Sequence, residues 1–443
     1  MATGLLKGES RKTLYNLWIS RYSQFCQYSQ DVRGGWVVMT VKRIKAEELQ
    51  VGMYITEVSD AWAADSHLKA EGLVTREDTV TRIQGLGVAY LYIDTSKGGD
   101  CSGAVPVQNI ARLHERELAK LQREAHADTG NKVDFKTARK HAVKIRSRAL
   151  SMVGDIMKDV KMGNKLDVLA VDDLAHDIVD SLAGNQNALA TMMRLRHKDQ
   201  YLLEHSFSVA VLMGMLTRSL DYHGDAMQPL VLGALLHDIG KIRVPPEILN
   251  KLGKLDPAEW EEMKRHVDYG METLADTPGV SDTAKLICAQ HHERLDGTGY
   301  PFQLQAADIS IYGRMGAVVD VYDAVTADRV YHQGMTPTVA LRKMLEWSGN
   351  HLDRELVYQL IRCISVYPPG SLVVLQTGQV ALVREINALK QTLPVVELIY
   401  DPVARRRLSS GLIDLASADP DQYGAVVKAV EPEEYGLRVD EFL

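Results

Sequence analysis

The chain has 443 residues, more than one compact core normally holds, so the sequence predicts two or three domains. Its composition, with 46% hydrophobic and 25% charged residues, is ordinary for a soluble globular protein. The formal net charge of -7 excludes a bulk basic field that would grip a nucleic-acid polymer. A phosphate-bearing ligand would therefore need local positive charge, from a metal or from a few placed Lys and Arg side chains.

Cysteine usage and hydropathy indicate the compartment. Four cysteines, Cys26, Cys101, Cys288 and Cys363, lie far apart and form no CxxC pair. This fits a reducing cytoplasm and argues against a disulfide framework or a cysteine zinc site. No apolar run approaches the roughly 18 residues that a membrane span needs, so we expect a cytoplasmic protein without membrane insertion.

The N-terminal part divides into an extension and a small module. Residues 1–38 differ in residue pattern from the rest of the chain. Because Met39 stands where a domain is expected to begin, these residues are either an upstream extension or a start-site artefact. Residues 39–98 predict a small α/β module, with strands at 39–44, 52–58 and 88–94 and a helix at 77–87. Its lone "GLG" is too weak a signal for nucleotide binding.

The rest of the chain predicts three further parts. Residues 99–135 are expected to form a Gly-, Ser- and Pro-rich linker and a polar connecting helix at 110–126, which is a candidate for homodimerisation although its apolar stripe is thin. Residues 136–365 carry apolar residues at i, i+3 and i+4 and predict a helical domain. Residues 366–443 contain strand patterns around turns and predict a small β-rich appendage.

A set of histidines and aspartates in the helical region favours a metal site. A His-Asp pair at a helix end can place an imidazole and a carboxylate on one cation, and the two carboxylate oxygens can also bridge two cations. Each member alone would be an ordinary core or surface residue, but a buried carboxylate without a partner is costly. Within about 120 residues the chain presents His205, His237, Asp238, His266, His291, His292, Asp320 and Asp323. Mixed imidazole and carboxylate ligands without thiolate suit Fe, Mn or Zn.

Three motifs in this order resemble the HD-GYP subgroup of the HD-domain phosphohydrolases. They are "LLHDIGK" at 235–241, "HHERLDGTGYP" at 291–301 and "VDVYDAVTADR" at 319–329. The resemblance implies a mainly α protein, in which an all-helical HD-type core at 136–365 carries the small module and the appendage. It also implies a phosphodiesterase that hydrolyses cyclic di-GMP to pGpG, GMP or both. The module at 39–98 resembles a domain of unknown function that often precedes HD-GYP domains.

The resemblance also implies a ligand set. The first metal would take His205, His237, Asp238 and Asp320, and the second would take His266, His291 and His292, with Asp238 bridging. Members with a third metal carry a Glu four residues before the first histidine, where this chain has Tyr201. Glu204 lies on a different helix face. We therefore expect two divalent ions per chain, with Fe or Mn favoured and Zn or Ni also compatible.

The remaining motif residues suggest how a diester would be held. Two metals can neutralise its charge and generate hydroxide near neutral pH, so Asp238 would be central to catalysis. Lys241 would hold a phosphate oxygen or protonate the leaving oxygen; the alternative is a plain surface lysine. Tyr300, Arg314 and Arg329 are candidate substrate contacts. Glu293, Asp296 and Asp323 are expected behind the ligands, where they would orient histidine N–H groups.

Two other functions remain compatible with these motifs. The protein could be a cyclic di-GMP sensor with little catalysis, an interpretation that degenerate ligands would favour. It could instead hydrolyse another cyclic dinucleotide such as cGAMP, because the motifs do not separate guanine-only from mixed substrates. The loop at 297–301 is also linked with partner-protein contact in the family, and glycines at 297 and 299 would let its backbone turn tightly.

Overall fold

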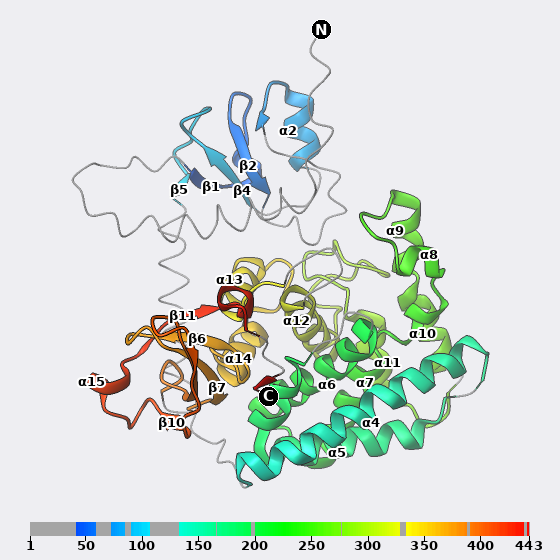
Figure 1. Cartoon of the computed structure of the whole chain (residues 1–443). Helices are drawn as coiled ribbons and strands as arrows, with labels where there is room; N and C mark the ends of the chain where they lie inside the picture. Colours follow the sequence, from blue (N-terminus) through cyan, green and yellow to red (C-terminus); the bar gives the residue numbers. More distant parts are fainter. Residues whose placement is uncertain are drawn as a thin grey trace.

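The computed structural model describes residues 41–58, 72–84, 90–106, 133–164, 166–195, 200–275, 277–327, 334–387, 390–437 and 441–442. The extension at 1–38, the expected connecting helix at 110–126 and the candidate contact Arg329 lie outside these residues. The predicted fold class is confirmed, because a helical domain carries a small antiparallel sheet at each end of the chain (Figure 1).

The N-terminal module is a five-stranded antiparallel sheet with one helix. Its strands β1 (Val41–Lys45), β2 (Tyr54–Val58), β3 (Gly72–Leu73), β4 (Tyr90–Asp94) and β5 (Val105–Pro106) lie in the order β3-β2-β4-β1-β5, and α2 spans Glu77–Gln84. Ile44, Ile55, Leu91 and Ile93 from the three longer strands form its core. The module is therefore built where β-branched residues predicted strands.

The expected boundary between the N-terminal module and the linker lies too early in the chain. The sequence predicts a linker from residue 99 onward, but Val105 pairs with Arg43 of β1 and extends the sheet to residue 106. A two-residue strand is too short to leave an alternating pattern in the sequence. Pro106 is tolerated there because β5 lies at the sheet edge, where a missing N–H breaks no central ladder.

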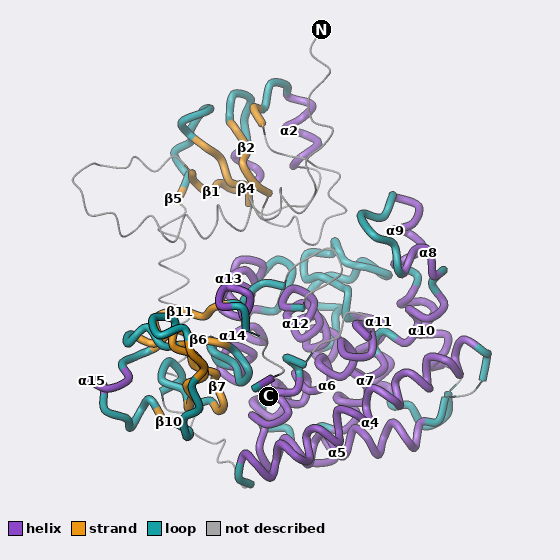
Figure 2. The backbone as a smooth tube through the Cα atoms, viewed as in Figure 1, coloured by secondary structure: helices purple, strands orange, loops and turns teal. Residues whose placement is uncertain are grey.

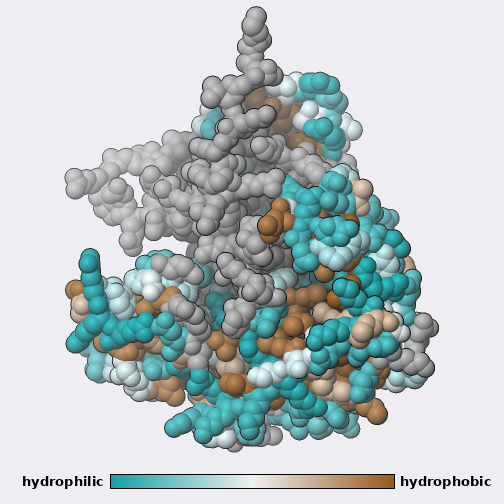
Figure 3. Space-filling model, turned by 45° about the vertical axis from the view of Figure 1, so that its right-hand side comes forward, coloured by the Kyte–Doolittle hydropathy of each residue, from teal (hydrophilic) through white to brown (hydrophobic). Residues whose placement is uncertain are grey.

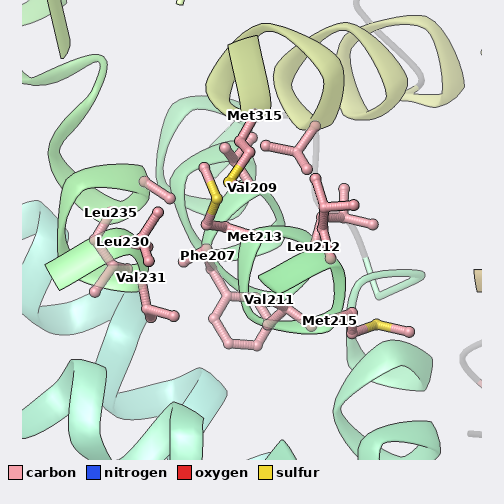
Figure 4. Packing of buried hydrophobic residues seen from close by; sticks show 14 of the residues in the cluster. Phe207, Val209, Val211, Leu212, Met213, Met215, Leu230, Val231, Leu235 and Met315 are labelled. Atoms are coloured by element: carbon pink, nitrogen blue, oxygen red, sulfur yellow. The ribbon is translucent and has the colours of Figure 1, made fainter. Parts of the chain in front are cut away.

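Helices of the central domain pack around α6 (Tyr201–Ser219), which is buried at every residue from 204 to 217. Its neighbours are α4 (Phe135–Lys161), α5 (Val168–Met192), α7 (Gln228–Leu236), α12 (Ile311–Thr326) and α14 (Arg354–Ile364), and α4 also packs along α5. Figure 4 shows Phe207, Leu212 and Met213 of α6 packed with residues of α7 and α12. A helix that is apolar on all sides is a central helix, as its sequence predicted.

Short helices complete this domain beside α7. A 3-10 turn η5 (Ile239–Arg243) follows α7 directly, and α8 (Pro246–Leu249), α9 (Pro257–Lys264), α10 (His266–Ala275) and α11 (Asp282–Gln290) come next. α10 packs on η5 and on α11, and α11 packs on α7 and α12. α13 (Pro337–Trp347) lies against α12 and α14. In Figure 2 the labelled helices α7, α10 and α11 lie next to one another, and α9 packs against α10.

The C-terminal sheet has the order β10-β8-β7-β6-β11, with β9 paired to β8. Its strands are β6 (Leu372–Leu375), β7 (Val380–Glu385), β8 (Val395–Asp401), β9 (Arg406–Arg407), β10 (Ile413–Asp414) and β11 (Val426–Val430), and α15 (Pro420–Tyr423) precedes β11. Alternate residues of β6 and β7 belong to two separate apolar clusters, so both faces of this sheet are covered.

Hydrogen bonds join both sheets to the helical domain. The Tyr92 hydroxyl of β4 donates to Glu346 of α13 at 3.1 Å. On the other side, the Ile386 N–H donates to Asn187 Oδ1 of α5 at 3.2 Å, and Gln391 Nε2 donates to the Arg362 carbonyl of α14 at 2.7 Å. The helical domain therefore contacts both sheets directly.

Polar residues predominate on the described part of the face that Figure 3 shows. In Figure 3, hydrophilic side chains cover most of the coloured atoms, and apolar residues appear between them in smaller groups. Across the described residues, none of the helices combines the length and the apolar character that crossing a bilayer requires.

The central position of α6 gives a stability prediction. Phe207 is 1% exposed and is among the largest fully buried side chains. Phe207→Ala should lower the free energy of unfolding by about 3–5 kcal/mol, because it removes buried apolar surface and leaves a cavity. Leu169→Ala, at a residue of α5 that is 78% exposed, is the matched control and should cost less than about 0.5 kcal/mol. Urea unfolding followed by circular dichroism measures both, and equal losses would contradict the packing described.

Candidate metal centre

Seven of the predicted site residues come from five separate elements and meet at one point. His205 projects from α6, and His237 and Asp238 follow the last residue of α7. His266 begins α10, the pair His291 and His292 follows α11, and Asp320 lies in α12. Six of the seven are buried, and His292 is partly exposed. The apolar helices that build the core thus carry their few polar side chains to a common place.

Asp238 lies between two pairs of histidines. Its Oδ2 is 3.3 Å from His205 Nε2 and 3.4 Å from His237 Nε2. Its Oδ1 is 3.4 Å from His266 Nε2 and 3.7 Å from His291 Nε2. Each oxygen of one carboxylate therefore faces a different pair of imidazoles, which is the arrangement a bridging ligand requires.

Asp320 and His292 complete the cluster. Asp320 Oδ1 is 3.1 Å from His205 Nε2 and 3.9 Å from His237 Nε2, while its Oδ2 is 3.8 Å from His292 Nδ1. The ligand atoms fall into two groups in which all atoms lie within 4.8 Å of one another: His205, His237 and Asp238, and Asp238, His266, His291 and His292. This His/Asp cluster can bind metal ions.

Backbone carbonyls fix the orientation of three histidine rings. His237 Nδ1 lies 2.7 Å from the Ala234 oxygen, His266 Nδ1 lies 2.7 Å from the Met263 oxygen, and His291 Nδ1 lies 2.8 Å from the Cys288 oxygen. A carbonyl oxygen only accepts, so each Nδ1 carries the proton and each Nε2 presents a lone pair to the cluster.

These carbonyls share one structural origin. Each belongs to the residue three before its histidine, in the last turn of α7, α9 or α11. Carbonyls of a last helical turn have no intrahelical partner, so they are available to a side chain just beyond the helix. The sequence therefore places a histidine directly after a helix end and obtains a ring with a fixed tautomer.

Three buried polar atoms of the cluster are acceptors that a cation would satisfy. Among the described residues, Asp238 Oδ1, His266 Nε2 and His291 Nε2 are buried without a hydrogen-bond partner. Such atoms are costly unless something binds them. All three are acceptors and they face one another, so a metal ion satisfies them where another acceptor would not.

Electrostatics keep His266, His292 and Asp238 in the forms that bind metal. Burial lowers the pKa of His266 to about 3 and that of His292 well below its usual value, so both imidazoles are neutral at pH 7. Burial alone would raise the pKa of Asp238, but the charges of Lys241 and His237 and a hydrogen bond from His205 hold it well below the usual range. Asp238 is therefore an anion.

His205 is held by a carboxylate behind it. Its Nδ1 is 2.7 Å from Asp323 Oδ2, and its Nε2 faces Asp238 and Asp320. Burial would lower the pKa of His205, but Tyr201 and these three carboxylates raise it well above the usual value. The prediction that Asp323 orients a histidine N–H agrees with this contact.

Lys241 points into the cluster. Its Nζ donates to Asp238 Oδ2 at 2.5 Å, and the side chain remains 20% exposed. Burial would lower the pKa of this amine, but Asp238 and Asp320 raise it, so Lys241 is a cation beside the candidate ligands. This position is inconsistent with the alternative that Lys241 is a plain surface lysine.

Tyr201 and Glu204 lie as the sequence reasoning required. The Tyr201 ring stacks on His205, with centroids 5.8 Å apart and planes at 10°. Glu204 instead forms an ion pair with Arg146 of α4, with 2.7 Å between Oε1 and Nη2. The carboxylate nearest in sequence to His205 is therefore turned away from the cluster and bound elsewhere.

Predicted roles for two acidic residues of the loop are corrected by the structure. Glu293 does not hold a histidine; its carboxylate accepts the N–H groups of Phe302 and Leu304 at 2.7 and 2.9 Å. Asp296 accepts the Thr298 N–H and pairs with His351, which is outside the cluster. Both residues shape the loop after His292, and their partners could not be read from the spacing of the motif.

The loop glycines are required by its path. A Cβ on Gly299 would lie 2.4 Å from the Arg294 nitrogen and 2.6 Å from the His292 oxygen, so no larger residue fits. Gly297 has φ +80°, a conformation that favours glycine. The turn returns the chain so that the Tyr300 N–H donates to the His292 carbonyl at 3.2 Å.

Of the candidate substrate contacts, Tyr300 lies beside the cluster and Arg314 does not join it. The Tyr300 ring stacks on His292, with centroids 4.6 Å apart and planes at 29°. Arg314 Nε donates to the Ile309 carbonyl at 3.0 Å, and its Nη1 pairs with Asp353 at 3.2 Å. Arg314 therefore joins the start of α12 to the start of α14, and this position does not support a role as a substrate contact.

The chain is similar to known proteins over most of its length. An HD domain model matches residues 189–356, and a model of a domain of unknown function, DUF3391, matches residues 41–171. The cyclic di-GMP phosphodiesterase PA4108 of Pseudomonas aeruginosa is 34% identical over 379 residues, which cover 85% of this chain and 90% of that protein.

Two further similarities are to a Vibrio phosphodiesterase and to a solved structure. The 3'3'-cGAMP-specific phosphodiesterase 2 of Vibrio cholerae is 43% identical over 127 residues, covering 28% of this chain and 24% of that protein. The solved structure of Bd1817, an HDG"Y"P protein from Bdellovibrio bacteriovorus, aligns with a TM-score of 0.43 at 19% identity over 72% of this chain and 98% of its own. Because the similarity to the Pseudomonas enzyme runs across most of both chains, the protein belongs to the HD-GYP family of HD-domain phosphodiesterases.

Proposed function

We propose that this protein is a metal-dependent phosphodiesterase that hydrolyses cyclic di-GMP to pGpG, GMP or both in the cytoplasm. The observation that carries the proposal is the Asp238 carboxylate, whose two oxygens each face a separate pair of imidazoles. The substrate follows the Pseudomonas relative, which is named a cyclic di-GMP phosphodiesterase and is similar over nearly its whole length.

Two divalent ions are proposed to bind the cluster, with Fe or Mn favoured and Zn or Ni compatible. His205, His237 and Asp320 would hold one ion, His266, His291 and His292 would hold the other, and Asp238 would bridge them. When bound, the ions would neutralise the charge of the diester and acidify a water molecule. Tyr201 supports two ions rather than three, because a phenol ring fills the position of the extra carboxylate.

The chain's own residues then position the diester and a proton. Lys241 is a cation on Asp238 whose side chain is 20% exposed, so its Nζ can bind a phosphate oxygen that enters from solvent. The same amine carries a proton that the leaving ribose oxygen can take. Asp323 keeps His205 oriented, and the last-turn carbonyls keep the other Nε2 atoms directed inward.

A second substrate has specific support. Three relatives from Vibrio cholerae are named 3'3'-cGAMP-specific phosphodiesterases, with identities of 36–43% over the part that matches. A sensor with little catalysis is less well supported, because every member of the expected two-metal ligand set is present and collected at one point. The test is to load purified protein anaerobically with Fe(II) or Mn(II), supply each dinucleotide and separate the products by chromatography.

Removal of the bridging carboxylate should abolish both metal binding and turnover. For His237→Ala/Asp238→Ala we expect less than one metal ion per chain by elemental analysis and no detectable pGpG or GMP, because both ion positions lose a ligand. His176→Ala is the control, since His176 lies on the exposed face of α5, where it pairs with Asp180. Full turnover by the double variant would refute the site.

Replacement of Lys241 should separate chemistry from metal binding. Lys241→Met should keep the metal content of the wild type and lower kcat for cyclic di-GMP by about 100-fold, the usual contribution of a positioned proton donor. Lys158→Ala, at an exposed surface pair on α4, serves as the control for loss of one positive charge. Unchanged kcat in the Lys241 variant with full metal content would remove Lys241 from the mechanism.

A further inference from the structure

A pocket of about 360 Å³ lies next to the candidate metal centre, between α9 and the loop that follows His292. Its volume is within the range of small-molecule sites. Its lining includes Trp260, Glu261, Lys264, Arg265, Arg294 and Tyr300. Except for Tyr300, none of these residues contributes to the metal centre.

Two aromatic rings form a corner of this pocket. The rings of Trp260 and Tyr300 have centroids 6.2 Å apart and planes at 81°. A flat ligand stacked on one ring therefore meets the edge of the other, which is a favourable geometry for both contacts. Aromatic side chains that line a small pocket are the usual platform for a nucleobase, because every base has a π-face.

Tyr300 connects the pocket to the metal centre. The ring that forms the corner with Trp260 also stacks on His292, 4.6 Å between centroids, and lies edge to face with His266 at 6.3 Å. The pocket and the candidate ligands are therefore separated by one side chain. A nucleotide has the same layout, with a base on one side of a ribose and a phosphate on the other.

The pocket is lined by charged residues of both signs. Lys264, Arg265 and Arg294 supply three cationic side chains, and Glu261 and Asp268 supply two carboxylates. Lys264 pairs with Glu261 at 2.7 Å and Arg265 pairs with Glu262 at 2.9 Å, and Lys264 Nζ lies 5.9 Å from the Tyr300 centroid. Guanine presents two acceptors, O6 and N7, that match an arginine fork or a lysine. Adenine has an amino donor in place of O6, so the cationic side chains favour guanine at that edge.

We propose that this pocket is a base subsite that binds one guanine of the cyclic dinucleotide while the adjoining phosphodiester lies at the metal cluster. The inference rests on the proposed function for the identity of the substrate. It adds a specificity-determining role for Trp260, with Tyr300 as the second wall. A mixed dinucleotide would bind in the orientation that places its guanine in the pocket, whereas a dinucleotide with two adenines would present an amino donor to the cations in place of O6.

The test compares Trp260→Ala with Trp260→Phe and with Phe302→Ala. Phe302 is an aromatic residue of the same loop that is 53% exposed and does not line the pocket. Trp260→Ala should raise KM for cyclic di-GMP about 10-fold and weaken its binding to EDTA-treated protein, measured by calorimetry, by a similar factor. Trp260→Phe should restore most of the affinity, and Phe302→Ala should match the wild type.

A diester without a base separates this subsite from the metal centre. Hydrolysis of bis(p-nitrophenyl) phosphate should be unchanged in Trp260→Ala, and cyclic di-AMP should bind the wild type at least about 10-fold more weakly than cyclic di-GMP. Unchanged cyclic di-GMP binding in Trp260→Ala, or equal affinity for the two dinucleotides, would overturn the subsite. Parallel loss on both substrates would also overturn it, because it would assign Trp260 a structural role.

Failure of the proposed function gives a different result. If the metal-loaded wild type hydrolyses neither diester, the phosphodiesterase proposal fails, and the calorimetric comparison still decides the subsite. Wild-type protein that binds no cyclic di-GMP would refute the subsite directly.

Discussion

The structure of the site depends on one buried carboxylate. Asp238 is almost fully buried, and an isolated anion in such a place is strongly unfavourable. The cation of Lys241 balances its charge, and imidazoles from α6, the end of α7, the start of α10 and the end of α11 surround it. Elements that are distant in the sequence thus meet at the place where a diester would react. A cation between each oxygen and its pair of histidines would satisfy the acceptors that the protein itself leaves without donors.

Helix ends supply the precision of this arrangement. His237, His266 and His291 each follow the last turn of a helix and each use a carbonyl three residues earlier. The same backbone that builds the apolar core therefore sets the tautomer of three rings without any further polar side chain. His205 lies inside a helix, where no carbonyl of a last turn is near, and Asp323 replaces it. Two different supports, a carbonyl or a carboxylate, give one result, which is an Nε2 atom directed at Asp238.

Much of this arrangement could be predicted from the sequence. Apolar periodicity predicted the helical domain, β-branched content predicted the longer strands, and the family resemblance predicted which histidines and aspartates would meet. Spacing could not predict contacts that depend on the path of a loop. Glu293 binds two N–H groups about ten residues later, and Asp296 pairs with His351. Arg314 is occupied by Ile309 and Asp353. The strand at 105–106 was missed because two residues carry no period. Metal binding by the assembled ligands stays a prediction.

The bridging role of Asp238 is tested most directly by locating the ions. Crystals of protein loaded anaerobically with Mn(II) would be measured at the manganese absorption edge, so that anomalous scattering marks each ion. We predict two peaks per chain, about 3.5–4 Å apart, one beside each oxygen of Asp238. A single peak, a third peak near Tyr201, or peaks away from Asp238 would contradict the central claim that this carboxylate bridges two metal ions.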